Sequence, residues 1–519
     1  MCPRLCDAIP HLRGIHDRVD RSFLFKLADA HAMEAPLVKQ RSRSADHPPL
    51  DPLDAAAMSV RPYGTMVALA MTLNYMIGTG CFGLPYAFAS AGLGLTSFFL
   101  VLGFVGALIT MNYTLETMAR AEGVVSNTKG TLPDNRLTYR KIDFSVIGDI
   151  FAGSMGYSVV QSVLVLYCLG SLWSYASIFA SSIASMVFTY VWNDSCDAYA
   201  VDATASCVNM YYISMLVFSV IAITMVLMDL GDQATIQKFL SVYRIVALFL
   251  MLVTLLIKLS HEGIDVISAR LAARDAWAFN WRNFSVGFGP TLLALNCQYN
   301  MPDAMQPLHT SVKSKARMIT FGAMTISGVF YLLLGILGAI AFDQVNPLAS
   351  LMWSDFTGCG NGWSQCPSGS PSWIGSIVHI VVLMFPVVNV TSTYPMVGLT
   401  VGGNLLTSLP KAWTAPLGAT RARNLSRLIA AIPPLILATL FKKLDAIFTF
   451  AGFFGFALGL IIPSWFQVIS IKYNQRAFQS DLAAMTPYGL PVVSSVLFAT
   501  IFLYLTFAFT IAALVSLAV

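Results

Sequence analysis

Long apolar segments recur along the chain from about residue 64 to its end, and short polar stretches separate them. A bilayer core of about 30 Å takes roughly 20 apolar residues of helix to cross. Segments of about that length or longer lie near residues 64–90, 93–118, 151–189, 209–228, 237–259, 284–302, 317–342, 372–407, 424–440, 446–470 and 488–518. The pattern predicts an all-α polytopic membrane protein with about eleven transmembrane helices.

The first sixty residues have a different pattern. Charges of both signs alternate with Pro and Ser, and no apolar periodicity is sustained. A segment of this composition has too little apolar surface to form a packed core. We therefore expect a mostly disordered tail over residues 1–60 and a transmembrane domain over residues 61–518.

The first apolar segment is interrupted by three glycines and a proline, Gly78, Gly80, Gly83 and Pro85. Inside a bilayer such a break is tolerated only where protein or a polar cavity satisfies the freed backbone groups. We predict a broken helix whose freed amides suit a substrate carboxylate and whose freed carbonyls suit a cation. Close helix packing through small residues is the alternative explanation. The residues expected to line the substrate here are Ile77, Gly78, Thr79, Gly80, Cys81 and Phe82.

A second interruption lies five segments later, over residues 284–302, and ends in the polar run Asn296–Asp303. Interrupted spans at corresponding positions of two five-span halves indicate an inverted-repeat transporter with its site at the midplane. We expect Asn296 and Gln298 to face the substrate, although a helix that merely ends early near Pro302 would give the same pattern. The two repeats and the extra helix are expected at about 64–259, 284–470 and 488–518.

Polar residues also gather in the eighth segment, over Asn389–Pro395. Hydroxyl and carbonyl oxygens without a full charge suit a weakly held Na+. Hydrogen bonding between helices would also account for them. In the third segment, Tyr175 is expected to line the substrate pathway, although close helix packing would also account for this stretch.

The composition excludes several other classes of protein. Only 11% of the residues are charged and 56% are hydrophobic, whereas soluble domains have about 25% charged residues. A net charge of +5 spread over 519 residues does not indicate a nucleic-acid-binding surface. Since the chain has neither a Gly-x-x-x-x-Gly-Lys loop nor a His-Glu-x-x-His motif, we expect no enzyme and no cofactor besides a coupling ion.

The basic residues of the short loops indicate the orientation. They follow the second, sixth, eighth and tenth segments, on the side of the N-terminal tail, and include Arg120, Lys313, Arg421 and Lys472. This bias predicts a cytosolic N-terminus. The loop with Arg270, Arg274 and Arg282 is an exception on the far side.

Two loops on that far side, Trp192–Val208 and Asp343–Pro371, lack Lys and Arg and hold four of the nine cysteines. In an oxidising compartment we expect local disulfides there, although spacing alone does not prove the connectivity. Asn193 opens an Asn-Asp-Ser acceptor sequence for N-glycosylation in the same compartment. The expected pairs are Cys196 with Cys207 and Cys359 with Cys366.

The stretch from Asn74 to Phe88, N-x-x-I-G-T-G-x-x-G-L-P-Y-A-F, resembles the first-span signature of the amino acid/auxin permease family. This family includes the sodium-coupled neutral amino acid transporters. Weaker likenesses cover Leu166–Tyr175, Pro290–Leu308 and Val390–Pro395, and the run Asn296–Gln298 departs from the family's usual aromatic and serine residues. The resemblance covers most of residues 64–518.

The resemblance implies an amino acid transporter with the fold of the amino acid-polyamine-organocation superfamily, in which spans one to ten form the inverted repeat. In sodium-coupled members the cation is held by an asparagine just before the first break and a threonine before the proline of span eight. These positions match Asn74 and Thr393. Proton-coupled members also exist, so the resemblance leaves Na+ and H+ open.

We therefore expect a secondary active transporter that moves an amino acid together with Na+ or H+ by alternating access. Its membrane is expected to be the plasma membrane or that of a lysosome or vacuole. The alternative is an amino acid sensor, or transceptor, that signals through its cytosolic tail.

Overall fold

The computed structural model describes residues 62–78, 80–127, 132–140, 142–192, 194, 196–200, 203–228, 230–274, 276–367, 369–409 and 415–518. The N-terminal tail expected over residues 1–60 lies outside the described residues, as do Thr79 and Asn193. Residues Val60–Val519 form one compact unit.

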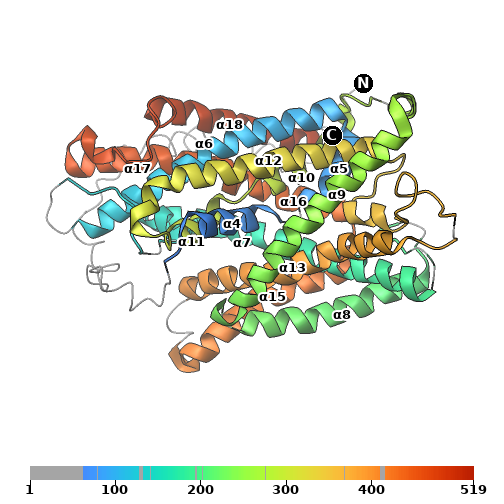
Figure 1. Cartoon of the computed structure of the whole chain (residues 1–519). Coiled ribbons are helices and arrows are strands. Elements are labelled where there is room, and N and C mark those ends of the chain that lie inside the picture. Colours follow the sequence, from blue (N-terminus) through green and yellow to red (C-terminus); the bar gives the residue numbers. More distant parts are fainter. Residues whose placement is uncertain are drawn as a thin grey trace, which may run out of the picture. The chain divides into compact units, whose positions relative to one another are not determined.

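The elements of this unit are helical, and an isolated bridge between Tyr63 and Leu308 is the sole β-type pairing within the described ranges. This confirms the all-α prediction (Figure 1). The main helices are α4 Thr65–Met76, α5 Gly80–Ala91, α6 Leu93–Ser126, α7 Phe144–Val187, α8 Ala205–Leu227, α9 Leu230–Ala272, α10 Phe284–Ala294, α11 Met301–Met305, α12 Ala316–Ala341, α13 Trp373–Ser408, α15 Ala419–Leu440, α16 Leu444–Phe456, α17 Ile462–Phe478 and α18 Val496–Ala518.

Within the described residues, eight helices are long and apolar enough to cross a bilayer, or nine spans when α4 and α5, bent by 52°, count as one. Two of the eleven expected spans do not reach this standard. The segment 284–302 is divided into α10 and the five-residue α11, and neither half is long enough alone. Helix α15 opens with Arg421, Arg423 and Arg427, so only its second half is apolar.

The two broken spans pack against each other in pairs of halves. Helix α5 lies against α10, and α4 lies against α11. A β-carbon on Gly80 would come within 2.5 Å of the amide nitrogen of Ala294, so glycine is required for the contact of α5 with α10. At the other pair, the Tyr63 hydroxyl donates to the carbonyl of Ala304 at 2.7 Å. The first break therefore combines the two explanations considered for it, a broken helix and a close packing contact.

The remaining helices surround these pairs. Helix α12 packs on α4, α5 and α6, while α13 packs on α7, α9 and α15. Figure 1 shows α9, in green, running obliquely beside α13 and α12. Helix α16 continues through a π-helical turn, Ala457–Ile461, into α17. Such turns are rare and are frequently found at functional sites.

Both expected disulfides are present, Cys196 with Cys207 and Cys359 with Cys366. The two disulfide loops are tied together, because the Asn346 amide donates to the Asp197 carboxylate at 2.8 Å. Their common end of the protein also holds the last turns of α9.

One residue counted above as a loop cation lies inside a helix. Helix α6 continues to Ser126, and Arg120 is only 2% exposed. Its guanidinium forms an ion pair with Glu116 at 2.6 Å and donates to the Gln467 side chain of α17 at 2.8 Å. Burial of an arginine is tolerated because every charged group of this cluster has a partner. Arg120 thus joins two helices and adds nothing to the loop charge that sets orientation.

Candidate functional site

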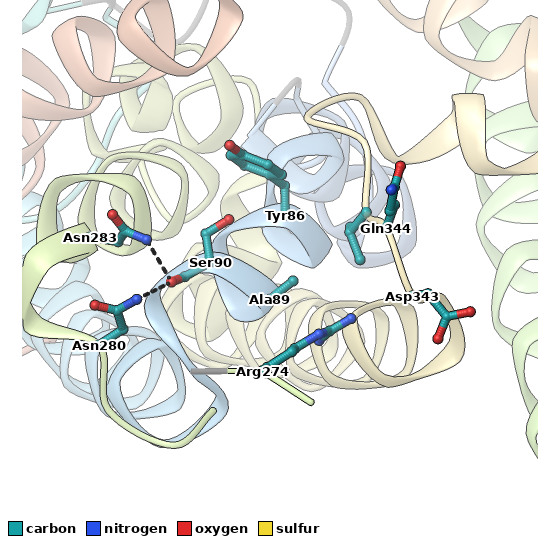
Figure 2. Close-up of a pocket in the computed structure, with 9 residues that line it drawn as sticks. Tyr86, Ala89, Ser90, Arg274, Asn280, Asn283, Asp343 and Gln344 are labelled. Atoms are coloured by element: carbon teal, nitrogen blue, oxygen red, sulfur yellow. Dashed lines mark hydrogen bonds between the residues drawn. The ribbon is translucent and has the colours of Figure 1, made fainter. Parts of the chain in front are cut away.

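A cavity of about 420 Å³ lies at the end of α5 that is remote from the break (Figure 2). Its lining includes Ser90, whose carbonyl accepts hydrogen bonds from the side chains of Asn280 at 3.2 Å and Asn283 at 3.0 Å. Ser90 is about 15 Å along the helix axis from Gly80. This cavity is therefore distinct from the predicted site and belongs to the end that carries the disulfide loops.

At the break itself, carbonyls in the last turn of α4 accept hydrogen bonds from donors that are not part of regular helix. The carbonyl of Met76 accepts from the Tyr331 hydroxyl of α12 at 2.7 Å and from the amide of Gly78 at 2.8 Å. The chain leaves the helical path at Ile77, where ψ is 76°. Tyr331 thus holds the last carbonyl of α4 from a neighbouring helix.

Helix α5 then starts at Gly80 with its first turn buried. The opening N–H groups of a helix have no acceptor within that helix, and they carry its positive dipole end. The Cys81 thiol donates to the carbonyl of Gly78 at 3.1 Å and stabilises the turn between the two halves. This start of α5 is suited to an anionic group such as a carboxylate.

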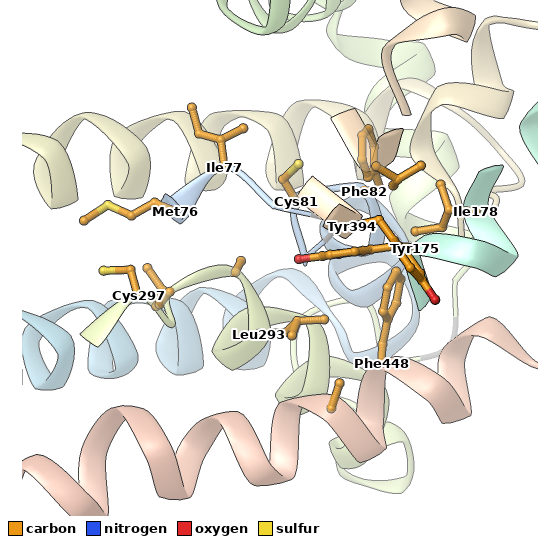
Figure 3. Packing of buried hydrophobic residues seen from close by; sticks show 14 of the residues in the cluster. Met76, Ile77, Cys81, Phe82, Tyr175, Ile178, Leu293, Cys297, Tyr394 and Phe448 are labelled. Carbon is orange, nitrogen blue, oxygen red and sulfur yellow. The ribbon is translucent and has the colours of Figure 1, made fainter. Parts of the chain in front are cut away.

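Aromatic side chains form the wall beside this helix start (Figure 3). Tyr175 of α7 points toward the break, and a β-carbon on Gly78 would lie 3.8 Å from the Tyr175 hydroxyl. Phe82 packs on Phe385 with ring centroids 5.0 Å apart. The structure thus brings Gly78, Cys81, Phe82 and Tyr175 to one place, whereas Thr79 lies outside the described residues.

The two polar residues predicted at the second break differ in their surroundings. The Gln298 side chain is committed to structural hydrogen bonds, donating to the Thr110 hydroxyl at 3.1 Å and accepting from the Cys297 amide at 2.9 Å. The buried Asn296 amide has no hydrogen-bond partner among the described residues. It lies beside the π-helical turn, where a β-carbon on Gly459 would come within 3.1 Å of Asn296 Oδ1. Asn296 therefore has the greater capacity to contact a ligand.

A residue that the sequence analysis did not single out lies where a cation was expected. Arg244 of α9 is 2% exposed, and its Nη1 donates to the carbonyl of Asn74 at 3.3 Å. Its Nη2 donates to the carbonyl of Asn389 at 3.4 Å and to the hydroxyl of Ser392. Within the described part of the chain, no carboxylate forms an ion pair with Arg244. The sequence signal that could have identified this residue is an arginine within the apolar segment 237–259.

The two residues predicted to bind the cation flank this arginine. The backbone carbonyl of Asn74 accepts the hydrogen bond from Arg244 Nη1. The Thr393 hydroxyl donates to the carbonyl of Asn389 at 2.8 Å and interacts with Tyr175. The predicted cation site and the substrate wall are therefore adjacent, and Arg244 lies between α4 and α13 within them.

A helical membrane protein with two broken spans, paired half to half around a polar centre, has the architecture of a secondary transporter. A family model described as transmembrane amino acid transporter protein matches residues 61–346. Since this is more than half of the chain, the protein belongs to that family.

Other known proteins are similar to this chain in sequence or in fold. The transmembrane protein 104 homolog of Caenorhabditis elegans is 24% identical over 360 residues, which cover 66% of this chain and 68% of that protein. Human transmembrane protein 104 is 21% identical over 474 residues, with 80% and 89% covered. Among solved structures, MhsT in complex with L-phenylalanine has a TM-score of 0.54 at 11% identity, and the match covers 88% of this chain and 99% of MhsT. The chain is a multi-pass membrane transporter with this fold, and not an enzyme.

Proposed function

We propose that this protein is a secondary active transporter that carries an amino acid across its membrane by alternating access. The observation that carries the proposal is the break between α4 and α5, where a buried helix start faces Tyr175. Membership of an amino acid transporter family supports the substrate class, and the structurally similar MhsT was solved with L-phenylalanine.

The substrate carboxylate is proposed to bind the opening amides of α5, from Gly80 to Gly83, because a helix start favours an anion. Its side chain would then contact Phe82 and Tyr175, with Asn296 available for the amino group. Phe82 packs against Phe385, and the Phe448 ring lies against Gly83, so this wall is aromatic. We therefore propose a neutral amino acid as the substrate.

Transport would proceed by rocking spans one, two, six and seven against the others. These spans are α4 with α5, α6, α10 with α11, and α12, and α12 packs on α4, α5 and α6. The hydrogen bond from Arg120 to Gln467 joins α6 to α17 and so crosses from the moving group to the fixed group. We propose that this contact holds one end closed in the present conformation.

A cation gradient, of Na+ or H+, is proposed to drive the uptake. The N-terminus is proposed to be cytosolic, because the loops that lack Lys and Arg carry the disulfides and would face an oxidising compartment. The membrane would be the plasma membrane or that of a lysosome or vacuole. In the same orientation Asn193 would lie on the non-cytosolic side, and we propose it as a glycosylation site.

Reconstitution tests this function. The purified protein in liposomes is given a mixture of tritiated L-amino acids, with an inward Na+ gradient and an inward proton gradient imposed separately. We expect concentrative uptake with at least one gradient, and its absence with both would refute cation coupling. Removal of residues 1–60 should leave this uptake intact, whereas a sensor that signals through its tail would lose its output.

A further inference from the structure

We propose that Arg244 is a resident cation that takes the place of a bound Na+, so that uptake by this protein does not depend on Na+. The inference rests on the proposed transport function and specifies how the same site is charged. Of the two proposed coupling ions, Na+ and H+, it leaves H+.

Three oxygen atoms from two helices converge on the Arg244 guanidinium. They are the carbonyls of Asn74 and Asn389 and the hydroxyl of Ser392. Asn74 lies in the last turn of α4, at the negative end of the helix dipole. Freed carbonyls and half-helix C-terminal ends of broken spans are the groups that hold coupling cations in transporters. In this chain one such carbonyl, that of Asn74, holds a guanidinium, and α13 supplies the other two oxygens.

A guanidinium in this position differs from an ion in one decisive respect. A coupling Na+ must bind and dissociate once in each transport cycle, whereas Arg244 is attached to α9 and stays charged at any physiological pH. A Na+ ion approaching the same oxygens would also meet a like charge at contact distance. The positive charge of the site is therefore permanent, and a Na+ gradient cannot act through it.

The charge of Arg244 also reaches the substrate wall. The guanidinium lies near Cys81 at the start of α5 and near Tyr175, whose hydroxyl faces Gly78. Since no carboxylate of the described residues neutralises Arg244, its charge is available to balance the carboxylate of a substrate bound at the α5 start. A bound Na+ would supply the same compensation in a site without the arginine.

Uptake measurements test this directly. Proteoliposomes receive a mixture of tritiated L-amino acids under a fixed proton gradient, in NaCl or in choline chloride. The wild type and Arg244→Lys should take up label equally in both salts. Arg244→Ala should lose about tenfold or more in choline chloride, and NaCl should restore part of that loss because the oxygens are freed.

Two outcomes would overturn the inference. One is a wild type whose uptake falls by about tenfold when choline replaces Na+. The other is an Arg244→Ala variant that takes up label at the wild-type rate in choline chloride. Arg244→Gln, a neutral side chain of similar polarity, replaces Arg244→Ala if that variant does not fold.

Thermal unfolding of the detergent-solubilised protein gives a second readout that needs no transport. The midpoint of the wild type should be the same in NaCl and choline chloride at equal ionic strength, whereas NaCl should raise the midpoint of Arg244→Ala. The reverse pattern, a response of the wild type alone, would overturn the inference. Absence of any wild-type uptake would refute the proposed function, and the unfolding midpoints would then decide the role of Arg244 independently.

Discussion

The guanidinium of Arg244 on α9 lies 3.3 Å from the carbonyl oxygen of Asn74 in the last turn of α4. This contact joins a helix of the proposed moving group to a helix of the proposed fixed group. It also gives a carbonyl at the end of a broken helix a charged hydrogen-bond donor within the membrane. The charge of the site and the geometry of the first break are therefore linked through one side chain.

Loss of the Ser392 hydroxyl should destabilise the protein, because it removes an acceptor from a buried arginine. We expect Ser392→Ala to lower the free energy of unfolding by about 1.5–3 kcal/mol. Thr391→Ala on the same helix is the matched control, since its hydroxyl donates only along the helix to the Val387 carbonyl at 2.7 Å. Chemical unfolding in detergent measures both. Equal losses for the two variants would show that Ser392 has no special relation to Arg244.

Two buried tyrosines allow a comparison in which the chemical change is identical. The Tyr331 hydroxyl donates to Met76 at the break, and the Tyr394 hydroxyl donates to Ala431 of α15, each at 2.7 Å. Replacement of either by Phe should cost about 1 kcal/mol of stability. Only Tyr331→Phe should alter the KM for uptake, because of these two tyrosine hydrogen bonds only that of Tyr331 contacts the end of α4. A change of KM in Tyr394→Phe and not in Tyr331→Phe would argue against the site.

The close approach of α5 to α10 predicts a strong effect of a single methyl group. A β-carbon on Gly80 would lie 2.5 Å from the Ala294 amide nitrogen, whereas one on Gly322 of α12 has its nearest neighbour at 3.9 Å. Gly80→Ala should lower the free energy of unfolding by about 1–3 kcal/mol through overpacking. Gly322→Ala should be neutral or slightly stabilising, because alanine favours helix. Unfolding and uptake assays on the two variants check this, and a tolerated Gly80→Ala would mean that the breaks are less tightly packed than described.

The Glu116 carboxylate is 1% exposed and accepts from Arg120 at 2.6 Å and from Gln467 at 2.9 Å. Glu116→Gln should destabilise the protein by about 3–5 kcal/mol, because it leaves a buried arginine without a counter-charge. Asp134→Asn, which breaks an exposed pair with Arg136, should cost less than about 1 kcal/mol. Urea unfolding compares them.

A double variant gives a further check on the Glu116 cluster. Arg120→Met in the Glu116→Gln background removes the charge that the single variant leaves uncompensated. Part of the lost stability should therefore return. A double variant less stable than Glu116→Gln alone would contradict this explanation.

Structural features that depend on residues close together in the sequence were predictable. Gly78, Gly80 and Pro85 marked the first break because such residues disfavour an uninterrupted helix wherever they occur. The disulfides were predictable because each of two loops that lack Lys and Arg holds a pair of cysteines. The number of full-length spans was harder to predict, because α10 and α11 divide one apolar segment and the arginines of α15 shorten another.

Features made by contacts between distant segments were not predictable. Two of the three partners of Arg244 are backbone carbonyls, which leave no residue pattern on α4 and α13. The hydrogen bond from the Gln298 amide to the Thr110 hydroxyl of α6 could not be read from the sequence, because the direction of a side chain within a broken helix is set by its neighbours. Glu116 and Arg120 had the spacing of an ion pair, yet only the extension of α6 to Ser126 shows that the pair is buried.

Solute counterflow tests the central claim, amino acid transport through the paired breaks, most directly because it needs no coupling gradient. Liposomes loaded with unlabelled L-amino acids are diluted into a tritiated mixture, with equal salt and pH on both sides. The wild type and Gly322→Ala should show a transient accumulation of label that Gly80→Ala and empty liposomes lack. A wild type that accumulates no more label than empty liposomes would contradict the account.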